Sequence, residues 1–470
     1  MIRCAMVLGI LAAMAPAQEA KTFRAGAAAS NITPPLGEPI VGGWSSPPAT
    51  KIHDELHARC FALDDGKTTL VLAICDNVGI PREVFDEARR LASEETGLPP
   101  ERFLFSSTHT HSATTARGEK ALDRDYTKFL IRRIADGARR AIGNLEPARI
   151  AWGSVQAPEH VFNRRYFLKE GTKIPDPFGG EDKVLMNPGV GNPNVVRPAG
   201  PTDPEVSYLL LRAKKDDRPI GLLANYSLHY VGGVPEGHVS ADYFAVFADR
   251  LRELFKTEKS DPPFVGAMSN GTSGDVNNID VMGKPQKHPP YEKMKLVADS
   301  VAQKVFESAE KATMRDGVGL TVAMKELVLR NRKPDAERVA RAKEILARPK
   351  DEKPAHSREV AYAQRTLQLA DVPDIVSVPL QVFRIGDLAV NAIPFEVFTD
   401  IGLEIKKTTP FERTFTISLA NGSYGYLPTP EHHALGGYET WMGTNRVEVE
   451  ASRKIVATIQ ELLKELKSKP

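Results

Sequence analysis

The stretch ERFLFSSTHTHS, residues 101–112, joins an apolar run typical of a buried strand to a polar segment that carries two histidines. On either side lie segments with apolar residues at helical spacing, Glu83–Glu95 and Tyr126–Ile142, and a glycine stops each of them. Phe129 and Leu130 are expected on the buried face of the second. This alternation of helix and strand continues along the chain. It predicts an α/β fold with mixed sheets flanked by helices.

Further elements are expected where apolar runs lie between turn signals. The expected strands are Tyr208–Ala213, Ile220–Ser227, Phe264–Met268, Val378–Ile385, Leu388–Ile393 and Thr414–Leu419, and the expected helices are Ala241–Phe255, capped by Ser240, and Val447–Leu466. Turn residues at 216–217 and 386–387 predict two hairpins. The charged segment Pro334–Ala370 predicts a helical hairpin on the surface. Since no strong linker divides the chain, we expect one composite domain over residues 25–466.

The composition is that of an ordinary soluble globular protein, with 470 residues, 41% of them hydrophobic and 26% charged. The formal net charge is +2, and no run of like charges occurs before the Lys-rich C-terminus. Nothing here indicates nucleic acid or an anionic membrane surface as a partner.

The first residues predict export. Arg3 precedes the apolar run Cys4–Ala15, and Ala15-Pro16-Ala17 offers the small residues that a signal peptidase reads. The run is shorter than the ~20 residues that span a bilayer, and no other segment is long and apolar enough to do so. We interpret residues 1–17 as a signal peptide, cut after Ala17, that sends the protein to the periplasm or outside the cell. The alternative is an apolar N-terminal strand or helix of the fold.

Two cysteines remain after this cleavage, Cys60 and Cys75, in two strand-like runs around Asp65-Gly66. A tight hairpin at that turn places Cys60 opposite residues 71–72 and the two thiols about 13 Å apart along the ladder. A disulfide needs Cα atoms within ~7 Å. Two buried free thiols are therefore expected.

Two stretches dense in glycine, proline and asparagine, Lys169–Pro204 and Asp280–Pro290, are expected to be loops. Long loops of this kind are either binding loops or plain surface insertions, and the sequence leaves both interpretations open.

Polar clusters follow several of the expected strands. His109 and His111 stand two residues apart on a segment expected to be extended, so they should point to the same side, where a zinc ion could take one of them. The alternative is a pair of surface histidines. The other clusters are Asn225–His229, Ser269–Asn278, Pro394–Glu396 and Asn421–Tyr438.

Each of these other clusters also has a structural explanation when taken alone: a satisfied histidine, a tight turn, a strand-end glutamate, packing tyrosines. Together they indicate more, because ligands collect beyond the carboxyl ends of strands in open α/β sheets. Histidines and a carboxylate are the expected ligands of a catalytic zinc that keeps one position open.

Several segments, in chain order, carry a resemblance to a known family. They are NITPP at residues 31–35, HAR at 57–59 with DDG at 64–66, THTHS at 108–112, Asn163-Arg164, His229, and Gly425-Tyr426 with Tyr438-Glu439. Together they resemble the neutral, non-lysosomal ceramidase family over residues 25 to about 450. The family's C-terminal immunoglobulin-like domain has no counterpart in this sequence.

The resemblance implies one zinc ion per chain, held by His109, His229, Glu396 and Tyr426. Tyrosine is an unusual zinc ligand, and spacing alone does not suggest it. The implied metal is zinc rather than another divalent ion because of the ligand types.

The resemblance also implies that His111, Arg164 and Tyr438 hold the amide carbonyl and its developing oxyanion, a role that needs preorganised donors. The implied activity is that of an exported hydrolase in which zinc-bound hydroxide attacks an amide carbonyl of a ceramide-like N-acyl lipid. An acid and an amine are released.

Two departures bear on this activity. Residues 274–279 read GDVNNI where the family has GDVSPN, so Asn277 replaces a serine linked to catalysis. Asn277 can hydrogen-bond a substrate carbonyl but cannot act as nucleophile or base. The histidine motif continues as Ala113-Thr114-Thr115 without the usual glycine-rich segment, which shapes the pocket opening.

Other functions therefore stay open at this point: hydrolysis of a non-lipid amide or ester on the same scaffold, or a non-catalytic binding protein that a metal stabilises. The sequence does not fix the substrate or the oligomeric state.

Overall fold

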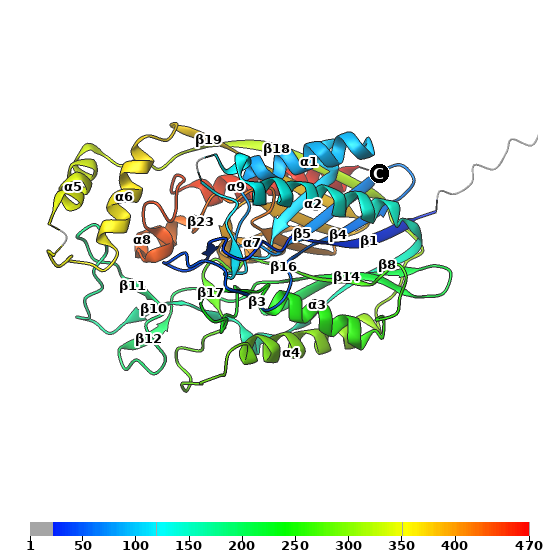
Figure 1. The fold of residues 1–470 in the computed structure, drawn as a ribbon, viewed down its shortest axis with the longest axis horizontal. Helices are drawn as coiled ribbons and strands as arrows, with labels where there is room; N and C mark the ends of the chain where they lie inside the picture. Colours follow the sequence, from blue (N-terminus) through cyan, green and yellow to red (C-terminus); the bar gives the residue numbers. More distant parts are fainter. Residues whose placement is uncertain (1–21, 119, 350, 470) are drawn as a thin grey trace, which may run out of the picture.

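The computed structural model describes residues 22–118, 120–349 and 351–469. The expected signal peptide, residues 1–17, lies outside the described residues. Three groups of strands pack around a shared apolar core, and a pair of helices covers the outer face of each group (Figure 1). The expected α/β class, with mixed sheets flanked by helices, is confirmed.

The first group is half of an eight-stranded sheet. Its strands are β1 (Arg24–Asn31), β4 (His57–Asp64), β5 (Thr69–Cys75) and β6 (Phe103–Ser107), and its helices are α1 (Arg82–Thr96) and α2 (Asp125–Gly143). Alternate residues face opposite sides, as the strand period requires: Phe61 and Leu63 enter the shared core, while Cys60 and Ala62 pack under the helices.

The second half of this sheet holds four more strands. They are β8 (Glu146–Gln156), β13 (Glu205–Ala213), β14 (Pro219–Tyr226) and β16 (Val265–Asn270), covered by α3 (Tyr243–Leu254) and α4 (Glu292–Ala309). Among residues 22–469 that the structure describes, the strands of the two halves pair only at Arg24 with Pro147 and at Ala25 with Glu146. Because this junction is so short, the sheet can bend there, and Phe61 and Val265 of the two halves share one core.

The third group is a separate four-stranded sheet. It contains β18 (Leu320–Arg330), β19 (Ile375–Ile385), β20 (Leu388–Ile393) and β22 (Arg413–Ser418), covered by α7 (Thr399–Thr408) and α9 (Ala451–Ser468). The expected hairpins at residues 216–217 and 386–387 are both present. None of the helices in the described ranges combines the length and apolar character that crossing a membrane requires.

A smaller lobe stands at one end of the molecule (Figure 1). It contains the expected helical hairpin, α5 (Ala336–Ala347) and α6 (Glu359–Ala370). It also contains a three-stranded sheet of β10 (Arg165–Leu168), β11 (Val184–Met186) and β12 (Val195–Pro198). The prediction that Lys169–Pro204 lacks structure of its own is therefore wrong, because two short strands within it pair with β10.

Three boundaries differ from expectation for local reasons. Helix α3 starts after Asp242, whose carboxylate accepts the Tyr243 amide, whereas the expected cap Ser240 donates to Asp54. Helix α9 starts at Ala451, since Val447 is extended and bridges to Asn331. Phe129, expected on the buried face of α2, is 41% exposed.

The register of the first hairpin also differs. The chain turns through a four-residue loop in which the Asp65 carboxylate accepts the amides of Lys67 and Thr68. Cys60 therefore lies opposite Ala73, and Cys75 lies opposite Ala58. The thiols are closer along the ladder than predicted, yet both are buried and free, as expected.

Candidate metal centre

The carboxyl ends of strands from all three groups meet at one site. Strands β5 and β6, β14 and β16, and β20 and β22 form the parallel pairs. Backbone hydrogen bonds join the segments that follow them: the Ser107 amide donates to Leu419 O (3.2 Å), and the Gly274 amide donates to Val397 O (2.8 Å). The clusters expected at strand ends therefore come together although they are far apart in sequence.

The two motif histidines approach each other, but not through an extended segment. His109 has a φ of +75°, a left-handed conformation that few non-glycine residues adopt. His111 Nε2 consequently lies 3.1 Å from His109 Nε2, with the rings edge to face. The prediction of an extended segment is wrong, whereas the proximity that it was used to infer is present.

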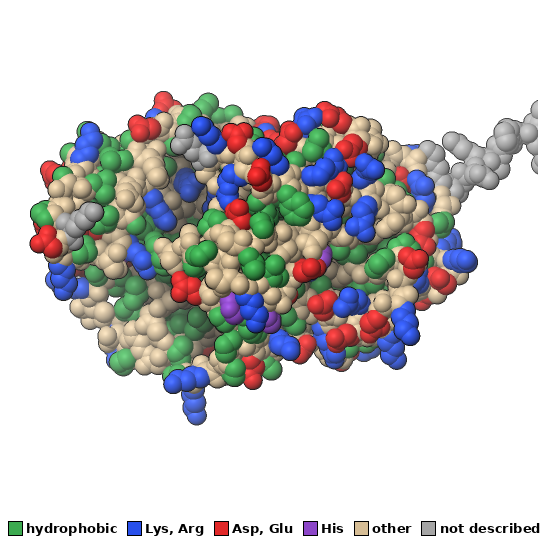
Figure 2. Space-filling view, in the orientation of Figure 1, with side chains coloured by type: hydrophobic (Ala, Val, Ile, Leu, Met, Phe, Trp, Pro, Cys, Tyr) green, Lys and Arg blue, Asp and Glu red, His purple; other side chains and the backbone are tan. Residues whose placement is uncertain are grey.

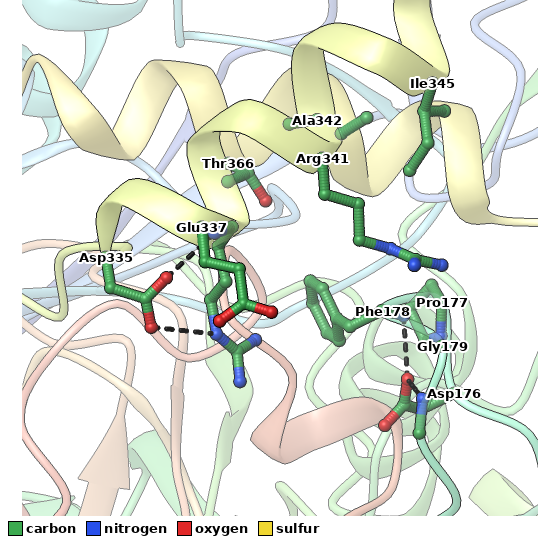
Figure 3. A pocket seen from close by; sticks show the side chains of 13 residues that line it. Asp176, Pro177, Phe178, Gly179, Asp335, Glu337, Arg341, Ala342, Ile345 and Thr366 are labelled. Atoms are coloured by element: carbon green, nitrogen blue, oxygen red, sulfur yellow. Dashed lines mark hydrogen bonds and ion pairs between the residues drawn. The ribbon is translucent and has the colours of Figure 1, made fainter.

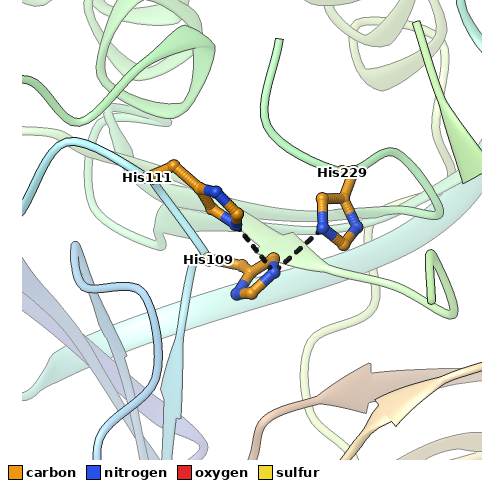
Figure 4. A group of neighbouring side chains, drawn as sticks. All are labelled: His109, His111 and His229. Atoms are coloured by element: carbon orange, nitrogen blue, oxygen red, sulfur yellow. Dashed lines mark hydrogen bonds between the residues drawn. The ribbon is translucent and has the colours of Figure 1, made fainter. Parts of the chain in front are cut away.

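A third imidazole completes what we call the histidine cluster: His109, His111 and His229 (Figure 4). His109 Nδ1 lies 2.5 Å from Val78 O, and His229 Nδ1 lies 3.0 Å from Ser273 O. A carbonyl only accepts, so both Nδ1 atoms must carry the hydrogen, and in the neutral rings each Nε2 presents a lone pair. These two Nε2 atoms are 3.0 Å apart.

Glu396 adds a third electron-pair donor. On parallel strands β21 (Glu396–Val397) and β23 (Tyr426–Leu427), Glu396 pairs directly with Tyr426. Glu396 Oε2 lies 3.2 Å from His109 Nε2 and 3.9 Å from His229 Nε2, and within the described residues this buried oxygen has no hydrogen bond of ordinary geometry. Burial opposes its ionisation, but positive charge at the His109 ring, as when that ring is protonated, and then the nearby Arg164 hold the pKa of Glu396 at about 2.

When His109 is neutral, three lone-pair atoms face one another here, and they repel unless a cation lies between them. Burial, and then the charge of His109, lowers the pKa of His229 well below its usual value, so a proton on that ring is disfavoured. A tetrahedral zinc site with bonds of about 2.0–2.1 Å has ligand–ligand edges of about 3.3 Å. The three separations here are 3.0, 3.2 and 3.9 Å, so the residues present fit a zinc ion.

A fourth ligand position has two candidates. Tyr426 stands beside Glu396, and burial raises its pKa well above the usual value while the charge of Arg164 opposes that rise. His111 is also within reach, because the ligand atoms of the histidine cluster all lie within 4.8 Å of one another.

Arg164 faces the same point. Its guanidinium donates to Tyr426 Oη (3.0 Å) and to Glu439 Oε1 (2.7 Å), and its Nη1 lies 3.5 Å from His229 Nε2. Burial opposes the charged form, yet Tyr426 and Glu439 raise the pKa of Arg164 well above its usual value. A permanent positive charge, fixed by a fully buried carboxylate, is therefore directed at the cluster.

The remaining expected site residues lie at different places. The Tyr438 ring stands edge to face with Tyr426, at 5.7 Å between centroids. Asn277 is bonded to nearby loops: its Nδ2 donates to Asn187 Oδ1 (2.7 Å), and its Oδ1 accepts the Ile279 amide (2.9 Å). No hydrogen bond among the described residues joins Asn277 to the histidines, and its role stays a prediction.

Two residues of the site were not predicted in any role. Tyr230 stacks on His111 with ring centroids 3.8 Å apart. Glu439 anchors Arg164. The only sequence signals were their positions next to His229 and Tyr438, which do not assign a function.

A second group with metal-ligand spacing, which we call the Asp275 cluster, consists of Asp275, Asp400 and His432. Here the His432 ring is satisfied: Nδ1 accepts from Arg165 Nη1 (2.8 Å), and Nε2 donates to Asp400 Oδ2 (3.0 Å). This ring therefore has no lone pair left for a cation.

The Asp275 carboxylate is satisfied as well. Oδ1 accepts from the Thr399 amide (2.9 Å), and Oδ2 accepts from Asn163 Nδ2 (2.8 Å). Because Asn163 precedes Arg164 and the Arg164 amide donates to Asp275 O (2.8 Å), this cluster fixes the turn that presents Arg164.

Cavities also occur outside the histidine cluster. One of about 460 Å³ lies between α5, α6 and residues 176–180, where Asp335 accepts the Arg338 amide and Asp176 accepts the Phe178 amide (Figure 3). Another, of about 700 Å³, is lined partly by the expected loop at residues 280–290. None of the expected site residues lines either cavity.

Comparison with known proteins bears on the fold. No family model matches the chain, and no curated protein matches it. A neutral ceramidase from Pseudomonas aeruginosa matches with a TM-score of 0.69 and 19% identity, over 95% of this chain and 74% of that chain. A ceramidase complexed with C2 matches with a TM-score of 0.69 and 16% identity, over 95% of this chain and 75% of that chain.

Identities this low establish the fold alone. The chain has the fold of these ceramidases, as the sequence resemblance predicted. Because the match covers nearly the whole chain, the expectation of one ceramidase-like unit is confirmed, while the site roles remain to be tested.

Proposed function

We propose that this protein is an exported, zinc-dependent hydrolase that cleaves an amide bond, with ceramide-like N-acyl lipids as the first substrates to test. One observation carries the proposal: two buried imidazole Nε2 atoms and one carboxylate oxygen face a common point, with a fixed guanidinium beside it. The ceramidase fold supports the choice of an amide.

His109, His229, Glu396 and Tyr426 are the residues that would hold the ion. A zinc ion bound there supplies a Lewis acid that polarises the carbonyl and lowers the pKa of water to about 7. The backbone carbonyls of Val78 and Ser273 keep the two histidines in the tautomer that leaves Nε2 free.

The chain's own residues stabilise the charge that develops on the substrate. Arg164, held by Glu439, donates toward the carbonyl oxygen, and its charge strengthens that bond in a site shielded from water. His111, clamped by Tyr230, provides a second donor. The Tyr438 hydroxyl makes no hydrogen bond with any described residue, so it is free to bind substrate.

The test pairs elemental analysis with hydrolysis of a short-chain fluorescent ceramide, in the wild type and in His109→Ala. We expect about one zinc per chain in the wild type and none in the variant, with loss of turnover. Bound zinc without ceramide turnover would support the metal site, and other amides and esters would then be screened as substrates. A wild type without bound metal would refute the proposal. The mass of protein recovered outside the cytoplasm tests cleavage after Ala17.

A further inference from the structure

A group of arginines near the metal centre lacks acidic partners. Most arginines of the described chain form an ion pair, as Arg82 does with Glu326. For Arg117, Arg358, Arg365 and Arg446, no carboxylate of the described residues lies within ion-pair distance; their contacts are neutral atoms and rings. We call these four residues the arginine group.

Two of them flank an exposed tryptophan. The guanidinium carbon of Arg358 lies 3.5 Å from the centroid of the Trp44 ring, and that of Arg365 lies 5.7 Å from it. Trp44 is 50% exposed and meets Tyr438 edge to face at 6.0 Å. The Tyr438 ring in turn contacts the ring of Tyr426, an expected zinc ligand. Trp44 is therefore two ring contacts away from that ligand.

Arg117 reaches the site from another direction. Its Nε donates to Gly79 O (3.1 Å), one residue after the carbonyl that holds His109. Its Nη2 donates to Ser423 Oγ (2.5 Å) in the loop before Tyr426. Both bonds are to neutral acceptors, so among the described residues only the more distant carboxylates of Glu396 and Glu83 act on its charge.

Arg446 lies in the segment between η4 (Tyr438–Thr440) and α9, which packs against Tyr426. Its neighbour Asn445 donates to Tyr426 O (3.1 Å). The Arg446 guanidinium itself makes no hydrogen bond with any described residue, although the side chain is accessible to solvent. It is therefore free to bind a ligand.

Three members of the group lie close enough for their charges to repel. Partial burial, and then the charges of Arg117 and Arg365, lower the pKa of Arg446 below its usual value, although its side chain still reaches solvent. Burial also lowers the pKa of Arg117, while the charge of Glu396 opposes that change. A bound anion would relieve this repulsion. Basic side chains are visible in the recess beside the lobe that carries α6 (Figure 2).

We propose that the arginine group binds an anionic part of the substrate. The preferred substrate is then an N-acyl amide with a carboxylate or sulfonate on its amine part, rather than a neutral ceramide. The inference rests on the proposed hydrolase. Guanidinium groups suit it, because their planar donors bind such oxyanions through paired, charge-assisted hydrogen bonds. Trp44 offers an apolar face beside them.

Three substrates with the same acyl chain test this: N-dodecanoyl-glycine, N-dodecanoyl-taurine and the neutral N-dodecanoyl-ethanolamine. We expect kcat/KM at least about tenfold higher for the anions, since a charge-assisted hydrogen bond contributes roughly that factor. Arg446→Gln and Arg365→Gln should each raise KM for the anions about tenfold and leave the neutral amide unchanged. Arg140→Gln, at an exposed arginine of α2 that has no ion pair with any described residue, is the matched control. A higher kcat/KM for N-dodecanoyl-glycine than for N-dodecanoyl-taurine would identify a carboxylate as the preferred anion. Equal values would mean that the site recognises the negative charge alone.

A binding measurement separates this inference from the hydrolase proposal. In zinc-free His109→Ala, N-dodecanoyl-taurine should still bind, by calorimetry, and Arg446→Gln in that background should weaken binding about tenfold. Such binding without hydrolysis in the wild type would support the anion site and refute the hydrolase. Equal cleavage of all three amides, insensitive to Arg446→Gln, would overturn the anion site and leave the hydrolase. Neither binding nor hydrolysis would overturn both.

Discussion

The histidine cluster and the Asp275 cluster both bring metal-ligand side chains together at similar spacing, yet only the first leaves lone pairs facing one another. In the histidine cluster, backbone carbonyl oxygens accept hydrogen bonds from the Nδ1 atoms of His109 and His229. The Nε2 lone pairs of the two neutral rings then face each other, with the Nε2 atoms 3.0 Å apart. In the Asp275 cluster a guanidinium donates to His432, and amide donors occupy Asp275. Donors and acceptors alternate in the second, while acceptors converge in the first, where Arg164 Nη1 makes only a long contact of 3.5 Å to His229 Nε2.

The difference teaches that proximity of potential ligands is a weak criterion for a metal site. What matters is whether each ligand atom already has a donor. Two adjacent arginines link the clusters: Arg164 faces the histidines, Arg165 faces His432, and the buried carboxylate of Glu439 lies 2.7 Å from one and 3.4 Å from the other.

The largest expected effect separates the two clusters directly. His229→Ala should abolish zinc binding and lower kcat/KM by roughly 10³-fold or more, because several kcal/mol of charge stabilisation are lost. His432→Ala should retain about one zinc per chain. Elemental analysis and amide hydrolysis measure both. Loss of zinc in His432→Ala at full folding, by circular dichroism, would contradict the distinction.

A smaller effect is expected at the two arginines. Arg164→Lys keeps the charge but loses the fork to Tyr426 and Glu439, so kcat/KM should fall by roughly 10² while zinc is retained. Arg165→Lys should leave kcat/KM near that of the wild type and lower the free energy of unfolding by about 1–3 kcal/mol, since it leaves buried acceptors unpaired. Substrate kinetics and urea titration distinguish the two. The reverse pattern would mean that Arg165 serves the reaction.

The smallest effect is expected at Asn277, the position where the resembled family has serine. Its carboxamide is engaged by Asn187 and the Ile279 amide, so Asn277→Ser should cost about 1 kcal/mol of stability and change kcat/KM by less than about threefold. Asn187→Ala removes the same side-chain bond and serves as the control. A gain in activity of tenfold or more in Asn277→Ser alone would show that the serine hydroxyl takes part in the reaction.

Local elements were predictable because their signals lie within a few residues. Strand β20 was predicted at its observed bounds, and β22 within one residue at each end, since apolar runs between turn signals suffice. The register of strand pairing was not predictable, because in the first hairpin it depends on how the Asp65 carboxylate accepts the amides of the loop. The strands within Lys169–Pro204 exist only through pairing with β10, which periodicity does not report.

In the site, too, some features were predictable from the sequence and others were not. His109 and His111 were singled out by their motif, but their approach depends on a positive φ at His109, for which a histidine gives no sequence signal. Glu439 belongs to one of the resembled segments, but the sequence assigned it no role. Its role exists only because the fold brings Arg164 and Arg165 to it from far along the chain.

The sequence by itself determined the class of the fold, the order of its elements and the side chains available at the strand ends, because these follow from periodicity and composition over short windows. Only the tertiary structure decided which lone pairs face each other, which carboxylates are already satisfied and which arginines gather without partners. Those features arise where three groups of strands pack together, and hydrogen-bond satisfaction there depends on atoms hundreds of residues apart, such as Arg164 and Glu439, which are 275 positions apart.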